Sequence, residues 1–308
     1  RNVTGVQTCA LPICIPLYDR FRALERPPEF YAGLKAAAEA QGLLFICSPF
    51  GVRSADILRD IGTRVFKIAS PEVNHFPLLR RVASFGRPVV LSSGVSTLGD
   101  LERAVEVLRA GAAADAVPAR AAVGLPPLSL LHCVTAYPAP EEEYNLRVIP
   151  NLAAVLGLPA GVSDHSRDPV LVPVLAVLEG AEIVEKHFTL ERSGAGLDDP
   201  IALTPGDFSR MVREIRAAET ELAAGRKAEA VEALEAAYGP ERVKAALGDG
   251  VKRLAPAEAD NYATTNRSVH ALRDIAAGEI LTEENTALLR SEKNLRPGLP
   301  PELWEAAL

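Results

Sequence analysis

The sequence predicts an α/β fold, a (β/α) TIM-type barrel followed by a small β domain. Short apolar runs alternate with amphipathic stretches rich in alanine, leucine and arginine, a pattern typical of a parallel sheet covered by helices. The runs are continuous rather than alternating, as in strands that are buried on both faces. The expected strands are 43–46, 65–68, 89–91, 128–131, 160–162 and 183–184, and the expected helices include 77–85, 98–108, 170–178 and 205–222. Thr204 precedes the last of these helices and is a predicted N-cap.

Changes in composition divide the chain into segments. Residues 1–23 form a proline-containing head whose start resembles translated sequencing-adaptor tails, so we expect it to be non-native or disordered. Residues 24–222 carry the barrel pattern and are the expected catalytic domain. Residues 223–265 are rich in Ala, Glu, Lys and Arg without strand patterns, which predicts a helical linker. Residues 266–308 show short strand patterns around a glycine turn, which predicts a small, truncated β domain.

Composition and charge argue against several classes of function. The chain is 48% hydrophobic and 24% charged, the balance of a globular protein with a substantial core. Its net charge of -7 argues against nucleic-acid binding, which needs a basic surface. The four cysteines match no zinc or disulfide spacing, and no run approaches the roughly 18 apolar residues of a membrane span. We therefore expect a cytoplasmic protein that binds neither nucleic acid nor a membrane.

Polar side chains follow each of the six expected strands. In a parallel (β/α) barrel these strand ends lie on one face, where active sites are built. A single polar strand end means little, but a succession of them predicts a catalytic site at this face. In chain order the residues are Cys47 and Ser48; Lys67, Ser70 and Glu72; Ser92 and Ser93; His132 and Cys133; Ser163, Asp164 and His165; Glu185, Lys186 and His187.

Two of these residues are candidate metal ligands. His165 and His187 end neighbouring strands, so both imidazoles can reach one divalent ion. A lone histidine at a strand end would more often be a hydrogen-bonded structural residue, but two of them, each beside an ionisable residue, favour metal binding. His132 ends another strand and stays open, whereas His75 and His270 are interpreted as ordinary residues.

Cations and hydroxyls at the same strand ends predict an anionic substrate. Lys67 and Lys186, with several hydroxyl or backbone donors, can hold a ligand that carries two negative charges. The alternative for Lys67 is a surface lysine with its ammonium group in solvent. We favour a phosphate-carboxylate substrate, because a neutral one would leave both cations without a role. The hydroxyl donors are Ser48, Ser70, Ser92 and Ser93.

Several segments together resemble the N-acetylneuraminate (sialic acid) synthase family. The resemblance runs from about Leu24 to Leu308, with the segments in the family's order and at its spacing. Arg267-Ser-Val-His-Ala-Leu-Arg-Asp-Ile-Ala-Ala-Gly278 resembles the family's C-terminal antifreeze-like (SAF) domain. The other segments are Lys67-Ile-Ala-Ser70, Leu91-Ser-Ser-Gly94, Leu131-His-Cys133, Tyr137-Pro-Ala-Pro140, Ser163-Asp-His165 and Glu185-Lys-His-Phe-Thr189.

The resemblance implies a domain-swapped homodimer, in which each barrel meets the small β domain of its partner subunit. It also implies a divalent ion, manganese first with magnesium or cobalt as alternatives, held by His165 and His187 and acting as a Lewis acid on a sugar aldehyde. Phosphoenolpyruvate would contact Ser48, Lys67, Ser70, Ser92, Ser163 and Lys186. The amino sugar would contact Glu72, Tyr137 and Asp198, with Arg267 reaching over from the neighbouring subunit. The expected catalytic residues are Lys67, Glu72, His165 and His187.

The chain departs from the family pattern in three places. The family's first two strands have no counterpart, so we expect a barrel that lacks them and a chain with little or no activity on its own. The family's Pro-Asp-His after the last strand reads Leu197-Asp198-Asp199, which predicts a difference in sugar specificity. The SAF domain stops before its final strands.

The function that the resemblance implies is that of a transferase of the N-acetylneuraminate synthase type. It would condense phosphoenolpyruvate with N-acetylmannosamine or a related amino-sugar aldehyde, releasing phosphate and giving a nonulosonic acid. One alternative is another phosphoenolpyruvate-dependent synthase of 3-deoxy sugar acids. The other is a non-catalytic homologue that serves polysaccharide or spore-surface assembly.

Overall fold

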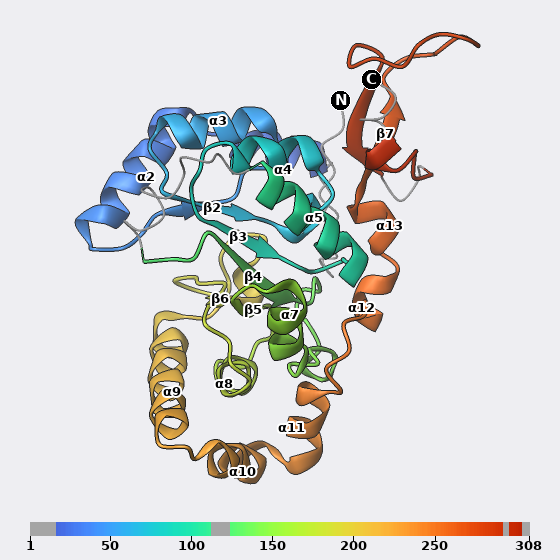
Figure 1. Cartoon of the computed structure of the whole chain (residues 1–308). Coiled ribbons are helices and arrows are strands. Elements are labelled where there is room, and N and C mark those ends of the chain that lie inside the picture. Colours follow the sequence, from blue (N-terminus) through green and yellow to red (C-terminus); the bar gives the residue numbers. More distant parts are fainter. Residues whose placement is uncertain (1–16, 112–123, 292–295, 304–308) are drawn as a thin grey trace. The chain divides into compact units, whose positions relative to one another are not determined.

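The computed structural model describes residues 17–111, 124–291 and 296–303 of the chain (Figure 1). The chain divides into two compact units. Unit 1 consists of Arg1–Val89, Gly99–Pro127 and Asp260–Leu308, and unit 2 consists of Val90–Leu98 and Leu128–Ala259. Residues 1–16 of the predicted head lie outside the described residues, whereas its remaining part lies in a helix, α1 (Leu17–Leu24).

Unit 1 combines short parallel strands, helices and a small antiparallel sheet. The sheet pairs β7 (Arg267–Ala271) with β8 (Thr286–Arg290), and Val269 in β7 also bridges to Leu299. The other elements of this unit are α2 (Pro28–Ala40), β1 (Ile46–Cys47), α3 (Val52–Asp60), β2 (Val65–Ile68), η1 (Ser70–Glu72), α4 (Phe76–Ala83), α5 (Leu98–Ala110, apart from its first residue) and α13 (Tyr262–Thr265).

Unit 2 carries the later strands and half of the described α-helices. In chain order its elements are β3 (Val89–Ser92, apart from its first residue), β4 (Leu128–Cys133), η2 (Glu141–Glu143), α7 (Val148–Leu156), β5 (Ala160–Asp164), α8 (Leu171–Leu178), β6 (Val184–Lys186), η3 (Asp199–Ile201), α9 (Pro205–Ala223), α10 (Lys227–Tyr238), α11 (Pro240–Leu247) and α12 (Pro256–Ala259).

Hydrogen bonds inside each unit establish the strand order. In unit 1, β1 pairs in parallel with β2, and the amide of Phe66 in β2 donates to the carbonyl of Pro88, directly before β3. In unit 2, the amide of Ser93 after β3 donates to Leu131 in β4, and β4, β5 and β6 pair in parallel. The order β1-β2-β3-β4-β5-β6 therefore follows the chain, as in a (β/α) barrel. The predicted α/β fold class is confirmed.

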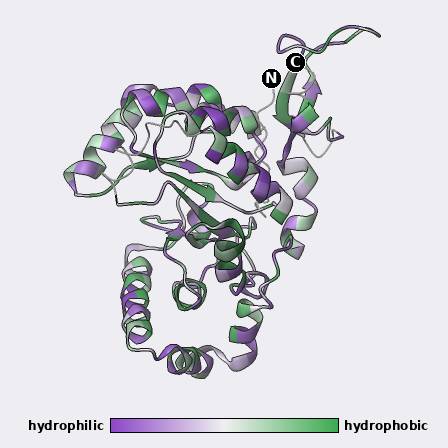
Figure 2. Cartoon of the chain, in the orientation of Figure 1, coloured by the Kyte–Doolittle hydropathy of each residue, from purple (hydrophilic) through white to green (hydrophobic). Residues whose placement is uncertain are grey.

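The core of unit 2 is built around α8. All eight residues of this helix are buried, and its ribbon is mostly green, the colour of hydrophobic residues, in Figure 2. It contacts β5 as well as α9, α10 and α11, so apolar neighbours surround it. A helix that is hydrophobic on all sides is stable only when it is enclosed in this way. The enclosed core in turn supports β5 and β6, and the candidate metal ligands directly follow these strands.

Two element boundaries illustrate the local chemistry. The strand expected at 43–46 begins only at Ile46, because Gly42 has a φ of 71° and the amide of Leu43 donates to the carbonyl of Ala38. Leu43 therefore belongs to the C-terminal turn of α2, not to a strand. The predicted N-cap is confirmed, since the hydroxyl of Thr204 accepts a hydrogen bond from the amide of Asp207. Within the part of the chain that is described, no helix has the length and apolar character required to cross a bilayer.

Candidate active site

Three aromatic rings in unit 2 lie together at the ends of neighbouring strands. His165 follows β5 and His187 follows β6, and their ring centroids are 5.2 Å apart. The ring of Tyr137 lies 4.3 Å from that of His165 and 5.8 Å from that of His187. The Oδ2 atom of Asp198 is 3.9 Å from the Nδ1 atom of His187. The structure thus brings together four of the residues that the sequence nominated.

Hydrogen bonds orient the ring of His165. Its Nδ1 atom is 2.8 Å from the carbonyl oxygen of Val134, and because a carbonyl only accepts, Nδ1 carries the proton. The Nε2 atom is thereby left as the nitrogen that can bind a metal. Burial lowers the pKa of His165, but the Cys133 sulfur, the Val134 carbonyl and the Asp164 carboxylate outweigh it and raise the pKa to about 9. A bound cation would therefore displace a proton.

Two neighbouring imidazoles are suitable ligands for a divalent ion, whose other ligands would be water or substrate. Burial and the positive charge of His165 lower the pKa of His187, which favours the neutral form that binds metals. Among the described residues, no group of three or more His, Cys, Asp or Glu side chains is placed to hold a metal. Of the donors that the sequence predicted for a metal, the described residues bring together the two imidazoles of His165 and His187.

Lys186 lies in a buried polar network beside the histidine pair. Its Nζ atom donates to Asp164 Oδ2 at 2.5 Å and to the carbonyl of Ser166 at 2.5 Å. The side chains of Lys186 and Asp164 are 1% and 0% exposed, respectively. The hydroxyl of Ser163 donates to Glu185 at 2.6 Å. Asp164 thus compensates the charge of Lys186, so this lysine does not need an anionic substrate as its partner, contrary to the prediction. Contact between Lys186 and the substrate stays a prediction.

In unit 1, a buried carboxylate lies between two arginines. Glu72 is 0% exposed, Arg267 Nε donates to its Oε2 atom at 2.7 Å, and Arg290 donates to its Oε1 atom. His75 Nδ1 lies 2.8 Å from Glu72 Oε2. Burial raises the pKa of Glu72, but both arginines and the hydrogen bond with His75 outweigh it and lower the pKa to about 2. The side chain of Asn74 binds the backbone of Arg267. Its Nδ2 atom donates to the carbonyl of Arg267 at 2.9 Å, and its Oδ1 atom accepts from the amide of Arg267 at 3.0 Å.

The remaining substrate-binding candidates lie at or near strand ends. Lys67 lies in β2 and is 8% exposed, so the surface-lysine alternative is wrong. Ser70 and Ser92 are buried and Ser48 is half-buried. The buried hydroxyls of Ser92 and Ser93 have no hydrogen-bond partner among the described residues. Buried hydroxyls are normally satisfied, so this pair is suited to a ligand that accepts hydrogen bonds.

Some residues were missed or misjudged from the sequence. Arg290 lies in β8 and belongs to the Glu72 cluster, but no local pattern distinguishes it from a surface arginine. His75 was interpreted as ordinary, although it is bound to Glu72. His132, left open as a ligand, has its Nε2 atom 2.5 Å from the carbonyl of Tyr144, so this nitrogen is committed to the backbone. Glu258 lies in the predicted linker and carried no signal at all.

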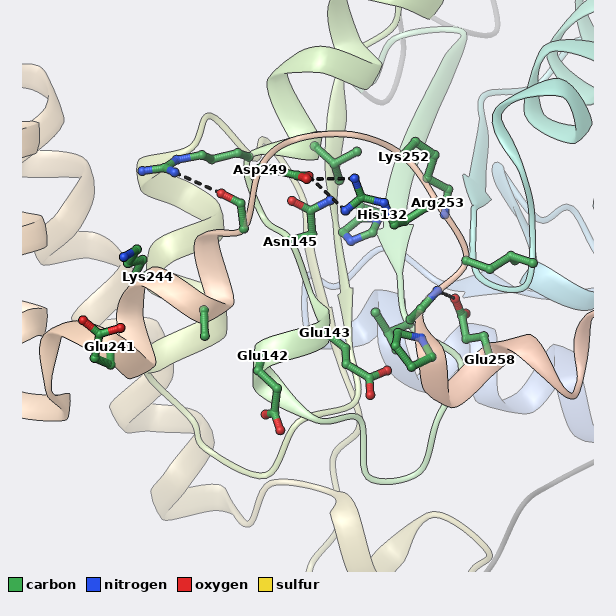
Figure 3. Close-up of a pocket in the computed structure, with 18 residues that line it drawn as sticks. His132, Glu142, Glu143, Asn145, Glu241, Lys244, Asp249, Lys252, Arg253 and Glu258 are labelled. Carbon is green, nitrogen blue, oxygen red and sulfur yellow. Dashed lines mark hydrogen bonds and ion pairs between the residues drawn. The ribbon is translucent and has the colours of Figure 1, made fainter.

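Unit 2 also contains a cavity of about 750 Å³ (Figure 3). Its lining comes from the segment around η2 and α7 and from the segment that runs from α11 to α12. Of the strand-end residues only His132 lines it, and both Glu258 and Lys252 border the same space. Both acidic and basic side chains line the cavity, so its charge favours neither anions nor cations.

Parallel strands in chain order, with polar side chains at their carboxyl ends, define the (β/α) barrel class. Within that class the chain belongs to the NeuB family, which matches residues 14–227. Residues 266–308 match the SAF domain. The family and the small C-terminal domain expected from the sequence are confirmed.

Known proteins provide three instructive comparisons. The structure of the spore coat polysaccharide biosynthesis protein SpsE from Bacillus subtilis matches with a TM-score of 0.78 at 31% identity, covering 95% of this chain and 75% of that chain. The N,N'-diacetyllegionaminic acid synthase of Campylobacter jejuni is 31% identical over 82% of this chain and 65% of its own length. A truncated 3-deoxy-D-arabino-heptulosonate 7-phosphate synthase from Thermotoga maritima has a TM-score of 0.54 at 17% identity, covering 65% of this chain and 74% of that chain, and shows the fold alone. The chain thus spans 65% to 75% of the lengths of these proteins.

Proposed function

We propose that this chain is the larger part of a synthase that condenses phosphoenolpyruvate with an amino-sugar aldehyde. The product would be a nonulosonic acid, formed from N-acetylmannosamine or a related N-acetylated amino sugar with release of phosphate. Membership of the NeuB family and the similarity to a legionaminic acid synthase support this class of reaction. The observation that carries the proposal is the convergence of His165 and His187 beside Tyr137.

The proposed mechanism assigns roles to the residues that the sequence resemblance indicated. A divalent ion, manganese first, would polarise the sugar aldehyde as a Lewis acid and would be held by His165 and His187. The methylene carbon of phosphoenolpyruvate forms the new bond to the aldehyde carbon, water adds to the enol carbon, and phosphate leaves. Fixed cations and hydroxyls stabilise the charge that moves to the phosphate. These donors would be Ser48, Lys67, Ser70, Ser92, Ser163 and Lys186, with Glu72, Tyr137, Asp198 and Arg267 contacting the sugar.

A homodimer forms part of the proposal. In the single chain, Arg267 and Glu72 of the same chain are paired. The sequence resemblance predicts that a neighbouring subunit supplies this arginine. A Glu72-Arg267 pair formed between subunits would use the same atoms. Glu72 would therefore keep the same ion pair if the small β domain were exchanged between subunits.

The test is His187→Ala in the full-length protein. We expect loss of metal-dependent phosphate release by at least about 100-fold, because one of two protein ligands is removed. Manganese should also no longer raise the melting temperature of the variant. His270→Ala is the matched control, because His270 lies in β7 and hydrogen-bonds to Ser268. Undiminished turnover in His187→Ala would contradict the ligand assignment.

A non-catalytic role in polysaccharide assembly is the second candidate. The similarity to SpsE favours it, since that protein serves spore coat polysaccharide biosynthesis. Under this alternative, alanine in place of Lys67, His165 or His187 would leave the biological function intact.

A panel of sugars separates the enzyme alternatives. Phosphate release with an N-acetylated hexosamine supports the proposed synthase, whereas release with arabinose phosphate or erythrose phosphate supports a 3-deoxy sugar acid synthase.

A further inference from the structure

A buried carboxylate from the segment after α11 binds the backbone directly after two strands of unit 2. Glu258 in α12 is 1% exposed. Its Oε1 atom accepts hydrogen bonds from the amide of Val95 at 2.8 Å and from the amide of Thr135 at 2.6 Å. Its Oε2 atom accepts from the amide of Ala255 at 3.2 Å, a bond visible in Figure 3. A charged side chain is rarely buried so completely unless several donors compensate it.

The two distant donors belong to turns that carry candidate substrate-binding residues. Val95 lies in the turn after β3, the strand that ends at Ser92, and Thr135 lies in the segment directly after β4, two residues before Tyr137. If Glu258 served only to cap α12, the hydrogen bond from the amide of Ala255 would be sufficient. The bonds to residues 163 and 123 positions away in the sequence therefore serve another purpose.

The turn after β3 needs an external constraint. Val95 has a φ of 44°, a left-handed conformation that is unfavourable for a β-branched residue. Besides Glu258, the same segment supplies Lys252, whose Nζ atom donates to the carbonyl of Ser93 at 3.0 Å. This segment thus holds the turn at Ser93 and at Val95, on either side of Gly94. The hydroxyls of Ser92 and Ser93 are buried there without a partner among the described residues.

We propose that Glu258 is a positioning residue for phosphoenolpyruvate, which fixes the turns after β3 and β4 so that the serine hydroxyls are presented in one orientation. The proposal rests on the proposed synthase function and adds a residue that touches neither substrate. A glutamine keeps one acceptor oxygen for the amides of Val95 and Thr135, but it removes the negative charge that strengthens both hydrogen bonds, and its NH2 group opposes the amide of Ala255. The turn would then relax, and the preorganised donors would bind the anion less tightly.

The experiment compares Glu258→Gln with Glu143→Gln in the full-length protein. Glu143 is the matched control, because its Oε2 atom accepts a hydrogen bond from Ala257 at 2.8 Å and so contacts the same segment without reaching either turn. Steady-state kinetics would be measured with each substrate varied in turn. We expect the KM for phosphoenolpyruvate to rise at least about fivefold in Glu258→Gln, with the KM for the amino sugar within twofold of wild type. Glu143→Gln should leave both constants unchanged.

The outcomes separate this proposal from the function on which it rests. Wild-type turnover together with an unchanged KM for phosphoenolpyruvate in Glu258→Gln overturns the positioning role, even if the melting temperature falls. Absence of turnover in the wild type overturns the proposed function and the positioning role with it. If Glu258→Gln does not fold, Lys252→Met decides, because Lys252 holds the same turn through Ser93. A raised KM for phosphoenolpyruvate in that variant supports the proposal, and an unchanged one overturns it.

Discussion

Burial of a single carboxylate, Glu72, couples the stability of unit 1 to pH. Its pKa of about 2 in the folded chain lies below the ordinary value of 4.5, because Arg267, His75 and Arg290 stabilise the ionised form against the effect of burial. This contribution is fully present above about pH 4.5 and is lost as the pH falls from 4.5 towards 2. The shift corresponds to a contribution on the order of 3 kcal/mol.

Glu72→Gln is therefore expected to destabilise the chain most at neutral pH. Two arginines would be left buried without a carboxylate, a change that typically costs about 3–5 kcal/mol. Urea unfolding between pH 7 and pH 3 should show the difference from wild type shrinking as the pH falls. Glu221→Gln is the control, because Glu221 forms an exposed ion pair with Arg226, and no measurable change is expected. A difference that does not depend on pH would contradict this origin.

At the scale of elements, α8 is the helix on which unit 2 depends. Leu175 in this helix is 0% exposed, and α8 contacts β5, α9, α10 and α11. Leu175→Ala would leave a cavity among these elements and is expected to cost about 2–5 kcal/mol in free energy of unfolding. Val212→Ala on α9 is the control, because its side chain is 39% exposed and should cost much less. Denaturant titration of both variants measures the difference.

If Leu175→Ala costs no more than Val212→Ala, α8 is not the centre of the core. The alanine-rich α10 and α11 would then not be held by packing against it. Such a result would also predict that the carboxyl ends of β5 and β6, next to His165 and His187, unfold locally at low cost in free energy.

At the scale of the whole molecule, an exposed apolar strand edge predicts self-association. Among the described strands, β1 pairs with β2 alone, and its residue Ile46 is 42% exposed. Unpaired strand edges with apolar side chains are templates for pairing with another chain. We expect Ile46→Lys to reduce association of the 308-residue chain, measured by light scattering across a concentration series. Val251→Lys is the control, because Val251 is 56% exposed outside any strand and the charge change is the same. If both substitutions reduce association equally, the added charge is the cause and pairing at the edge of β1 is not.

The sequence by itself determined the fold class, the family and the approximate positions of the strands, whose carboxyl ends extend up to two residues further in the structure than the apolar runs indicated. Continuous apolar runs and helical spacing are local properties, so they can be read along the chain without contacts. Histidines at the ends of neighbouring strands could be nominated for the same reason, since the carboxyl ends of parallel strands share one face. Even the cap at Thr204 followed from a local rule.

Only the tertiary structure decided which charges are paired and which turns are constrained. Lys186 meets Asp164, Glu72 meets Arg267 and Arg290, and Glu258 binds two turns far from it in the sequence. These residues are separated from their partners by between 22 and 218 positions. No periodicity encodes a pairing at such a distance, because its energy comes from desolvation and geometry that exist only after the chain has folded.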